Sequence, residues 1–176
     1  MKKFFFLFSF LFFFQNLYAE NKILYLDVNY LINNSEVGKY VTTELNKINK
    51  KNIEEFKLIE ASLKDKENNI LKQKNILKKD EYDLKIDDLK SEYNSYKELT
   101  NNKSNELKNL QNNAGEKILK IINNILSEYA IKHEVSLIID KKDVVIGKSN
   151  LDVTNDIMII LNNKIKKVEL KKWPIN

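Results

Sequence analysis

The chain of 176 residues contains no cysteine, no arginine, one histidine, one proline and three glycines. The absence of cysteine excludes disulfides, thiol catalysis and cysteine-based metal sites. All thirty basic residues are lysine, which is poorly suited to the bidentate recognition of phosphate or carboxylate that arginine provides. The scarcity of glycine and proline argues against a fold of many short strands and turns, and with abundant Lys, Glu, Asn, Leu and Ile it favours long helices.

The N-terminus has the pattern of an export signal. Lys2 and Lys3 precede an apolar run over residues 4–14, and Ala19 offers a small residue for cleavage. The run is shorter than the roughly 20 apolar residues that span a bilayer. We predict a signal peptide at residues 1–19 and export of the mature chain from the cytoplasm. An uncleaved anchor is the alternative, because Leu17 is bulky for its position, and without cysteine the chain cannot be a lipoprotein.

Two long stretches with helical periodicity, residues 37–77 and 82–130, occupy the middle of the chain. In the first, Phe56, Leu63, Ile70 and Leu77 are seven residues apart. In the second, apolar positions from Tyr82 onward alternate steps of four and three, which is typical of a coiled-coil seam. We predict an antiparallel helical hairpin over 37–130 with a turn near 78–81, each arm about 60–75 Å long at about 1.5 Å per residue. One uninterrupted helix over 37–130 is the alternative.

The flanking segments predict a small β-rich body. Residues 22–28, 135–140 and 143–147 are strand-like, with Lys141 and Lys142 forming the turn of a β-hairpin, and residues 153–167 predict a last helix. The fold class is therefore α+β, with a body from residues 20–36 and 131–168 and a tail at 169–176. Three strands leave open edges, so the body predicts self-association. The strand residues expected to form the oligomerisation body are Leu24, Leu26, Val28, Leu137, Ile139 and Val145.

No catalytic, cofactor-binding or metal-binding pattern is present, so we expect no enzyme. His133 has no nucleophile or orienting partner beside it in the sequence, and the acidic pairs Asp87–Asp88 and Glu54–Glu55 are best explained as solvated helix surface. Lysine clusters without arginine, on an exported chain with its aromatic residues on the seam, argue against nucleic-acid binding.

The distal half of the hairpin is charged with opposite signs on its two helices. Residues 64–79 contain six Lys against Asp65 and Glu67, whereas residues 80–100 contain seven acidic residues against three Lys. Ion pairs between the helices would explain this pattern, and contact with a client or with a membrane surface is the functional alternative. The candidate contact residues are Lys64, Lys72, Lys74, Lys78, Lys79, Tyr93 and Tyr96.

The order of these segments resembles that of the Skp/OmpH family of periplasmic chaperones. The opening run Lys22–Asn29 followed by Leu31, Ile32 and Gly38, and the closing segments 137–140, 144–145 and 152–154, are similar to the two ends of that family. The resemblance implies a homotrimer whose three arms surround a cavity that holds unfolded outer-membrane β-barrel proteins without ATP. The tail at 169–176 departs from the family, and the nearly neutral distal arm differs from its strongly basic tips.

The sequence thus predicts an exported, trimeric holdase chaperone that prevents aggregation of unfolded outer-membrane proteins, with a possible contact to a membrane surface or lipopolysaccharide. The alternative, from a different class, is a structural coiled-coil spacer or adaptor of the cell envelope.

Overall fold

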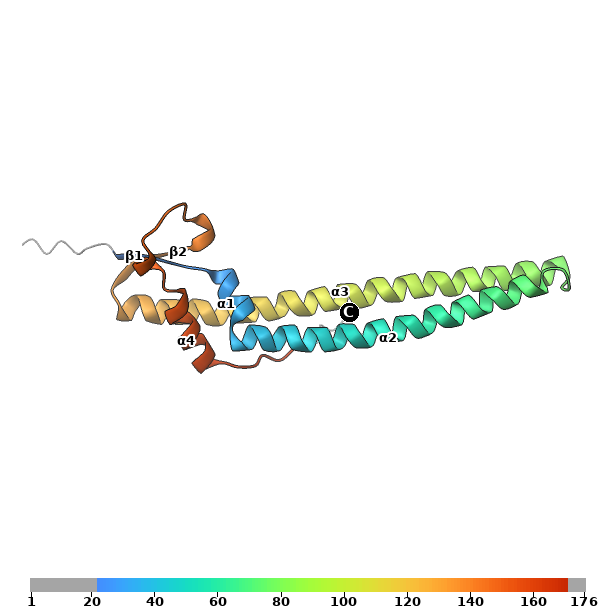
Figure 1. Cartoon of the computed structure of the whole chain (residues 1–176), viewed down its shortest axis with the longest axis horizontal. Coiled ribbons are helices and arrows are strands. Elements are labelled where there is room, and N and C mark those ends of the chain that lie inside the picture. Colours follow the sequence, from blue (N-terminus) through green and yellow to red (C-terminus); the bar gives the residue numbers. More distant parts are fainter. Residues whose placement is uncertain (1–21, 171–176) are drawn as a thin grey trace, which may run out of the picture.

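A long two-helix arm projects from a small body in the computed structural model, which describes residues 22–170 (Figure 1). The predicted signal peptide at 1–19 and residues 171–176 lie outside the described residues. The arm consists of α2 (Glu36–Gln73) and α3 (Lys79–Lys132). The body contains β1 (Lys22–Leu26), α1 (Val28–Asn34), β2 (Val135–Asp140) and α4 (Thr154–Lys164), together with the ends of α2 and α3 that lie beside them. This arrangement confirms the predicted α+β class with a long helical hairpin.

The two arm helices run antiparallel and meet at a connection formed by residues 74–78. The chain therefore reverses, and the alternative of one uninterrupted helix is wrong. The connection lies just before the predicted turn at 78–81, because Asp80 and Glu81 already belong to the first turn of α3. Carboxylates there are favoured by the partial positive charge of a helix N-terminus. At about 1.5 Å per residue, α2 is about 57 Å long and α3 about 81 Å long.

The two strands form a parallel pair, with Ile23 opposite Leu137 and Leu26 opposite Asp140. The predicted β-hairpin of 135–140 with 143–147 is wrong, since residues 141–143 form a 3-10 turn and no strand follows before α4. Tyr25 explains the difference. Its hydroxyl donates to the carbonyl of Lys148 at 3.1 Å, and its backbone carbonyl accepts from the N–H of Val153 at 2.9 Å. The segment after β2 is therefore held against β1 instead of folding back on β2.

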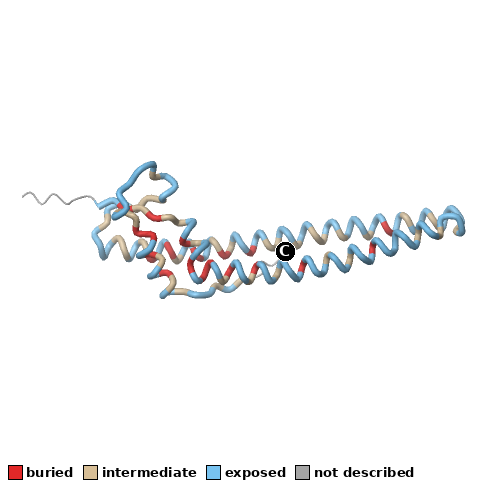
Figure 2. The backbone as a smooth tube through the Cα atoms, in the orientation of Figure 1, coloured by how far each residue is buried: buried red, intermediate tan, exposed pale blue. Residues whose placement is uncertain are grey.

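The core lies where α1, α4 and β1 meet the near ends of α2 and α3 (Figure 2). Helix α1 was not predicted. Asp27 caps it by accepting from the N–H of Tyr30 at 2.7 Å, and Ser35 both ends α1 and caps α2 by accepting from the N–H of Gly38 at 3.2 Å. The core members that are almost completely buried are Leu26, Leu31, Val37, Ile118, Ile122, Ile125, Ile157 and Leu161.

After α4 the chain continues without regular structure over residues 165–170 and lies against the base of the arm; we name this segment the strap. Lys166 Nζ lies 3.2 Å from Glu36 Oε2, and Lys117 Nζ donates to the carbonyl of Glu169 at 2.8 Å. Val168 and Leu170 pack against the core. The strap therefore contacts both helices of the arm.

Candidate interaction surfaces of the arm and the body

The seam of the arm is apolar near the body and thins with distance from it. Beyond residue 52 of α2, Leu63 is the only buried residue of that helix, and before residue 110 of α3 only Leu89 is buried, within the part of the chain that the structure describes. Polar pairs take the intervening positions. Lys103 lies 3.5 Å from Glu55, and Lys66 lies 2.6 Å from Glu92. The distal arm is therefore held by few apolar contacts.

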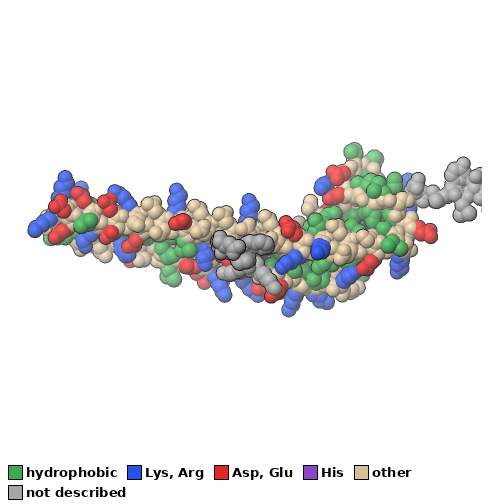
Figure 3. Space-filling view, turned by 180° about the vertical axis from the view of Figure 1, so that it is seen from behind, with side chains coloured by type: hydrophobic (Ala, Val, Ile, Leu, Met, Phe, Trp, Pro, Cys, Tyr) green, Lys and Arg blue, Asp and Glu red, His purple; other side chains and the backbone are tan. Residues whose placement is uncertain are grey.

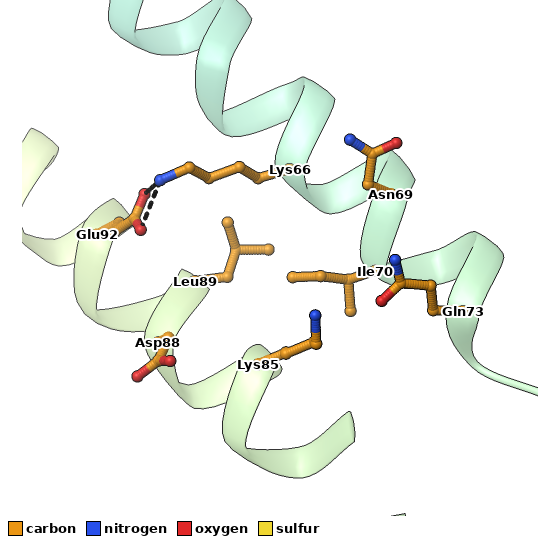
Figure 4. Close-up of a pocket in the computed structure, with 8 residues that line it drawn as sticks. All are labelled: Lys66, Asn69, Ile70, Gln73, Lys85, Asp88, Leu89 and Glu92. Carbon is orange, nitrogen blue, oxygen red and sulfur yellow. Dashed lines mark hydrogen bonds and ion pairs between the residues drawn. The ribbon is translucent and has the colours of Figure 1, made fainter. Parts of the chain in front are cut away.

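A hollow of about 240 Å³ opens between the helices near the end of the arm (Figure 4). Ile70 and Leu89 point toward each other across it, and the ion pair between Lys66 and Glu92 borders it. Its rim carries amide and charged side chains from both helices, and it holds no serine, threonine or histidine that could act as nucleophile or base. It is a widening of the seam, and its lining residues are Lys66, Asn69, Ile70, Gln73, Lys85, Asp88, Leu89 and Glu92.

The two tyrosines predicted as contact residues have different surroundings. Tyr96 lies on the seam, where its ring meets Phe56 edge-on at 6.1 Å between centroids and its hydroxyl donates to Glu60. The hydrogen bond to Glu60 raises the pKa of Tyr96, with burial and the carboxylate charge adding to the effect. Tyr93 is exposed and has 42% of its surface accessible. Of the two, Tyr93 is the one available to a partner.

The five lysines predicted as contact residues are all exposed. The inter-helix ion pairs expected to neutralise the distal arm are nearly absent. From residue 64 to residue 92, all of them described, only Lys66 and Glu92 pair across the two helices, whereas Lys90 pairs with Asp87 inside α3. The candidates Lys64, Lys72, Lys74, Lys78 and Lys79 make no ion pair with any described residue, so their charges face solvent.

The residues predicted for the oligomerisation body divide into an inner and an outer set. Leu24 and Leu26 are buried in the core of the single chain, and Val28 and Ile139 are half-buried. Leu137 has 51% of its surface exposed and Val145 is fully exposed, as is its neighbour Ile146 at 92%. Further exposed apolar side chains in the same region are Ile131 and Ile159. Figure 3 shows apolar side chains gathered over the body, whereas lysines and carboxylates intersperse along the arm.

A polar network around Asp152, which sequence reasoning missed, locks the segment after β2 to the body. Asp152 accepts from the N–H and the hydroxyl of Thr154 and pairs with Lys141 Nζ at 2.8 Å. Thr154 in turn accepts from the N–H of Asp27 at 2.9 Å. Burial alone would raise the pKa of Asp152, but the hydrogen bonds from Lys141 and Thr154 outweigh it and lower that pKa below its usual range. No local pattern could reveal this network, because its members come from three separate segments.

His133 ends α3, where its ring stacks on Tyr129 at 4.2 Å between centroids. Within residues 22–170, no three His, Cys, Asp or Glu side chains lie close enough together to hold a metal ion. None of the described helices combines the length and the apolar character that crossing a membrane requires.

A family model described as "Outer membrane protein (OmpH-like)" matches residues 22–161, which include both strands, the whole arm and most of α4. The chain belongs to the OmpH-like family. The match ends before the strap, so the strap lies outside the family pattern. Among curated protein sequences, none matches this OmpH-like chain significantly.

The OmpH-like fold is also seen in a crystal structure from Caulobacter crescentus CB15, described as that of a candidate outer membrane chaperone (OmpH-like). The alignment of the two structures covers 90% of this chain and 94% of the Caulobacter chain, with a TM-score of 0.80 and 16% sequence identity. At this identity the likeness establishes the fold, in which a long helical arm projects from a body with few strands.

Proposed function

We propose that this OmpH-like protein is a chaperone that acts as an ATP-independent holdase in the periplasm, where it encloses unfolded outer-membrane β-barrel proteins between the arms of a homotrimer. The observation that carries the proposal is a long, thinly packed arm attached to a body that is incomplete in one chain. Family membership and the described likeness to a candidate outer membrane chaperone support the same role.

The body supports the trimer because one chain leaves its sheet unfinished. A two-stranded sheet is marginal alone, and its open edges invite pairing with another chain. Val145 and Ile146 extend into solvent beside this sheet, and Leu137 is half exposed on β2. Contact between copies would bury these side chains, at about 25 cal/mol for each Å² of apolar surface removed from water.

The arm supports enclosure by many weak contacts. Its thin seam allows bending along the distal half. Several weak contacts made by three linked arms add up through effective concentration. A client held in this way is removed from aggregation by mass action, and no nucleotide is needed.

The test combines the mass of the assembly with its effect on a client. We expect light scattering to give a trimer, and we expect that trimer at stoichiometric amounts to prevent aggregation of a denatured outer-membrane β-barrel protein diluted into buffer. Val145→Asp with Ile146→Asp should give a monomer that no longer protects the client. Ser149→Asp with Asn150→Asp, two exposed positions nearby that gain the same charge, is the matched control and should leave both properties unchanged.

A trimer that leaves the aggregation unchanged would favour the alternative, a structural spacer of the envelope. A monomeric variant that protects as well as the natural chain would show that enclosure is not the mechanism.

A further inference from the structure

The end of the arm, which we name the tip and define as residues 71–84, exposes three large apolar side chains. Leu71 at the end of α2 has 54% of its surface accessible, Ile76 in the connection 80%, and Leu84 in α3 66%. Large apolar side chains this exposed, at the end of an otherwise charged arm, are candidates for contact with a partner.

Leu84 lies within a ring of carboxylates. Residues three and four positions away are its neighbours on the helix surface, and on both sides they are acidic: Asp80, Glu81, Asp87 and Asp88. All four are exposed. Among the described residues, their only ion pair joins Asp87 to Lys90 of the same helix, so this acidic surface is not neutralised by α2.

The opposite charge surrounds the other two apolar residues of the tip. Lys72 and Lys74 follow Leu71 closely in the sequence, and Lys74 and Lys78 lie on either side of Ile76 in the connection. These three lysines are exposed and make no ion pair with any described residue. Each tip therefore carries two apolar surfaces, one bordered by lysines and the other bordered by carboxylates.

We propose that these two surfaces dock on each other between copies, so that Leu84 and its carboxylates contact Leu71, Ile76 and the lysines of a neighbouring arm. The contact joins two different surfaces and repeats around a three-fold axis, which closes a ring of three tips. It rests on the proposed trimer and deepens its function, because joined tips close the far end of the cavity. A second copy is the occupant that fits, since the two borders match in charge, whereas an anionic membrane would be repelled by the carboxylates.

The chain has no cysteine, so a spin label can be attached at a single introduced site. Ser62→Cys places it on an exposed position of α2 before the tip. We expect pulsed electron paramagnetic resonance of the labelled trimer at low salt to show a population of short distances between arms. Raising the salt from about 0.1 M to about 1 M shortens the screening length from about 10 Å to about 3 Å and should reduce this population.

Charge reversal separates docking from other causes of closure. Lys72→Glu with Lys74→Glu should abolish the short-distance population, as should Asp87→Lys with Asp88→Lys. Adding Lys78→Glu, Asp80→Lys and Glu81→Lys to these four changes exchanges the two borders completely and should restore it. Lys50→Glu with Lys51→Glu, exposed lysines of α2 near the body, is the control for the added charge and should have no effect.

The apolar part of the contact is tested by Leu84→Ser, which should lose the short-distance population. The control is Leu58→Ser in the middle of α2, where the leucine is 75% exposed against 66% for Leu84, and it should keep that population. A trimer whose arms stay wide apart at low salt, or a variant with both borders completely exchanged that does not recover, would overturn the docking while leaving the holdase proposal intact. A monomer by light scattering would overturn both, and a mass that doubles with concentration would place the contact between trimers and overturn the closed ring.

Discussion

At the scale of single residues, two helical glycines differ in what surrounds them. A Cβ at Gly38 would lie 1.9 Å from the carbonyl oxygen of Ile32, because α1 crosses the start of α2 there, whereas a Cβ at Gly115 in α3 meets nothing within 4 Å. Gly38→Ala should therefore destabilise the protein by about 1–3 kcal/mol through overpacking. Gly115→Ala should stabilise it by about 0.5–1 kcal/mol, since alanine is the better helix former.

Urea titrations of the two variants at one protein concentration measure both effects, and equal signs for them would contradict the close approach of α1 and α2.

The network around Asp152 predicts a loss of stability in acid. A carboxyl group whose pKa is lower in the folded state contributes stability above its unfolded pKa, about 3.9, and loses it as the pH falls through the folded value. We expect the free energy of unfolding to decrease as the pH is lowered past about 4. The part of this decrease that comes from Asp152 should be absent in Asp152→Ala. At pH 7 that variant should lose about 1–3 kcal/mol, because Lys141 and Thr154 lose a charged partner.

Asp143→Ala, at an exposed carboxylate of the same region that forms no ion pair with any described residue, is the control for Asp152 and should change the stability at pH 7 by less than about 0.5 kcal/mol. An acid transition unchanged in Asp152→Ala would mean that other carboxylates dominate it.

Residue-level prediction from the sequence succeeded for the seam and failed for exposure in the body. The heptad spacing correctly marked Leu63 and Leu89 as seam positions, because burial between two helices follows a fixed period. In the body, the sequence pattern could not distinguish Leu24, which is buried within the single chain, from Leu137 and Val145, which remain exposed. All three are apolar residues of strand-like segments, and only the packing of distant elements decides which side is covered.

At the scale of elements, the thin distal seam predicts that the arm opens locally. Leu63→Ala and Leu89→Ala each remove a buried side chain, at a cost of about 2–5 kcal/mol for a fully enclosed leucine. Few other apolar contacts support this region, so we expect faster amide hydrogen exchange over about residues 56–100 with the body unchanged.

Leu58→Ala, where the leucine is 75% exposed, should leave exchange along the distal arm as it is in the natural chain. Loss of protection in the body of the Leu63 or Leu89 variants would show that arm and body unfold as one unit.

Elements with local signals were predicted better than elements defined by distant contacts. Residues 143–147 have the composition of a strand, yet β1 takes the place of a hairpin partner beside β2 and Tyr25 holds the following segment. Helix α1 is only seven residues long, too short for a periodic pattern, and its capping residue Asp27 lies in the run 22–28 that was predicted as a strand. The ion pairs expected between the helices of the distal arm are nearly absent for a related reason. Opposite charges on adjacent helices need not point toward each other.

At the scale of the whole molecule, the strap braces the arm against the body. It contacts α2 through Glu36 and Tyr40 and α3 through Lys117, while Val168 and Leu170 cover part of the core. Val168→Ser with Leu170→Ser should leave the fold intact, release the strap and widen the range of arm directions. Small-angle scattering should then give a broader distribution of dimensions, and amide exchange should rise near residues 36–45 and 114–121.

The exposed ion pair of the strap contributes only about 0–1 kcal/mol, so Lys166→Ala is the matched variant expected to leave both measurements nearly unchanged. Identical scattering from the double serine variant and the natural chain would show that the arm is oriented without the strap.

The parallel pairing of β1 with β2 has a consequence for the order of folding. Ile23 and Leu137 are neighbours in space but more than a hundred residues apart in the chain, with the entire arm between them. Local helical contacts form in microseconds, whereas pairing of such distant segments is slow because the loop must close first. The arm therefore forms early and the sheet late, and until the last quarter of the chain arrives β1 is an unpaired edge. A protein proposed to hold unfolded β-barrel proteins thus has an unpaired β-strand of its own while it folds.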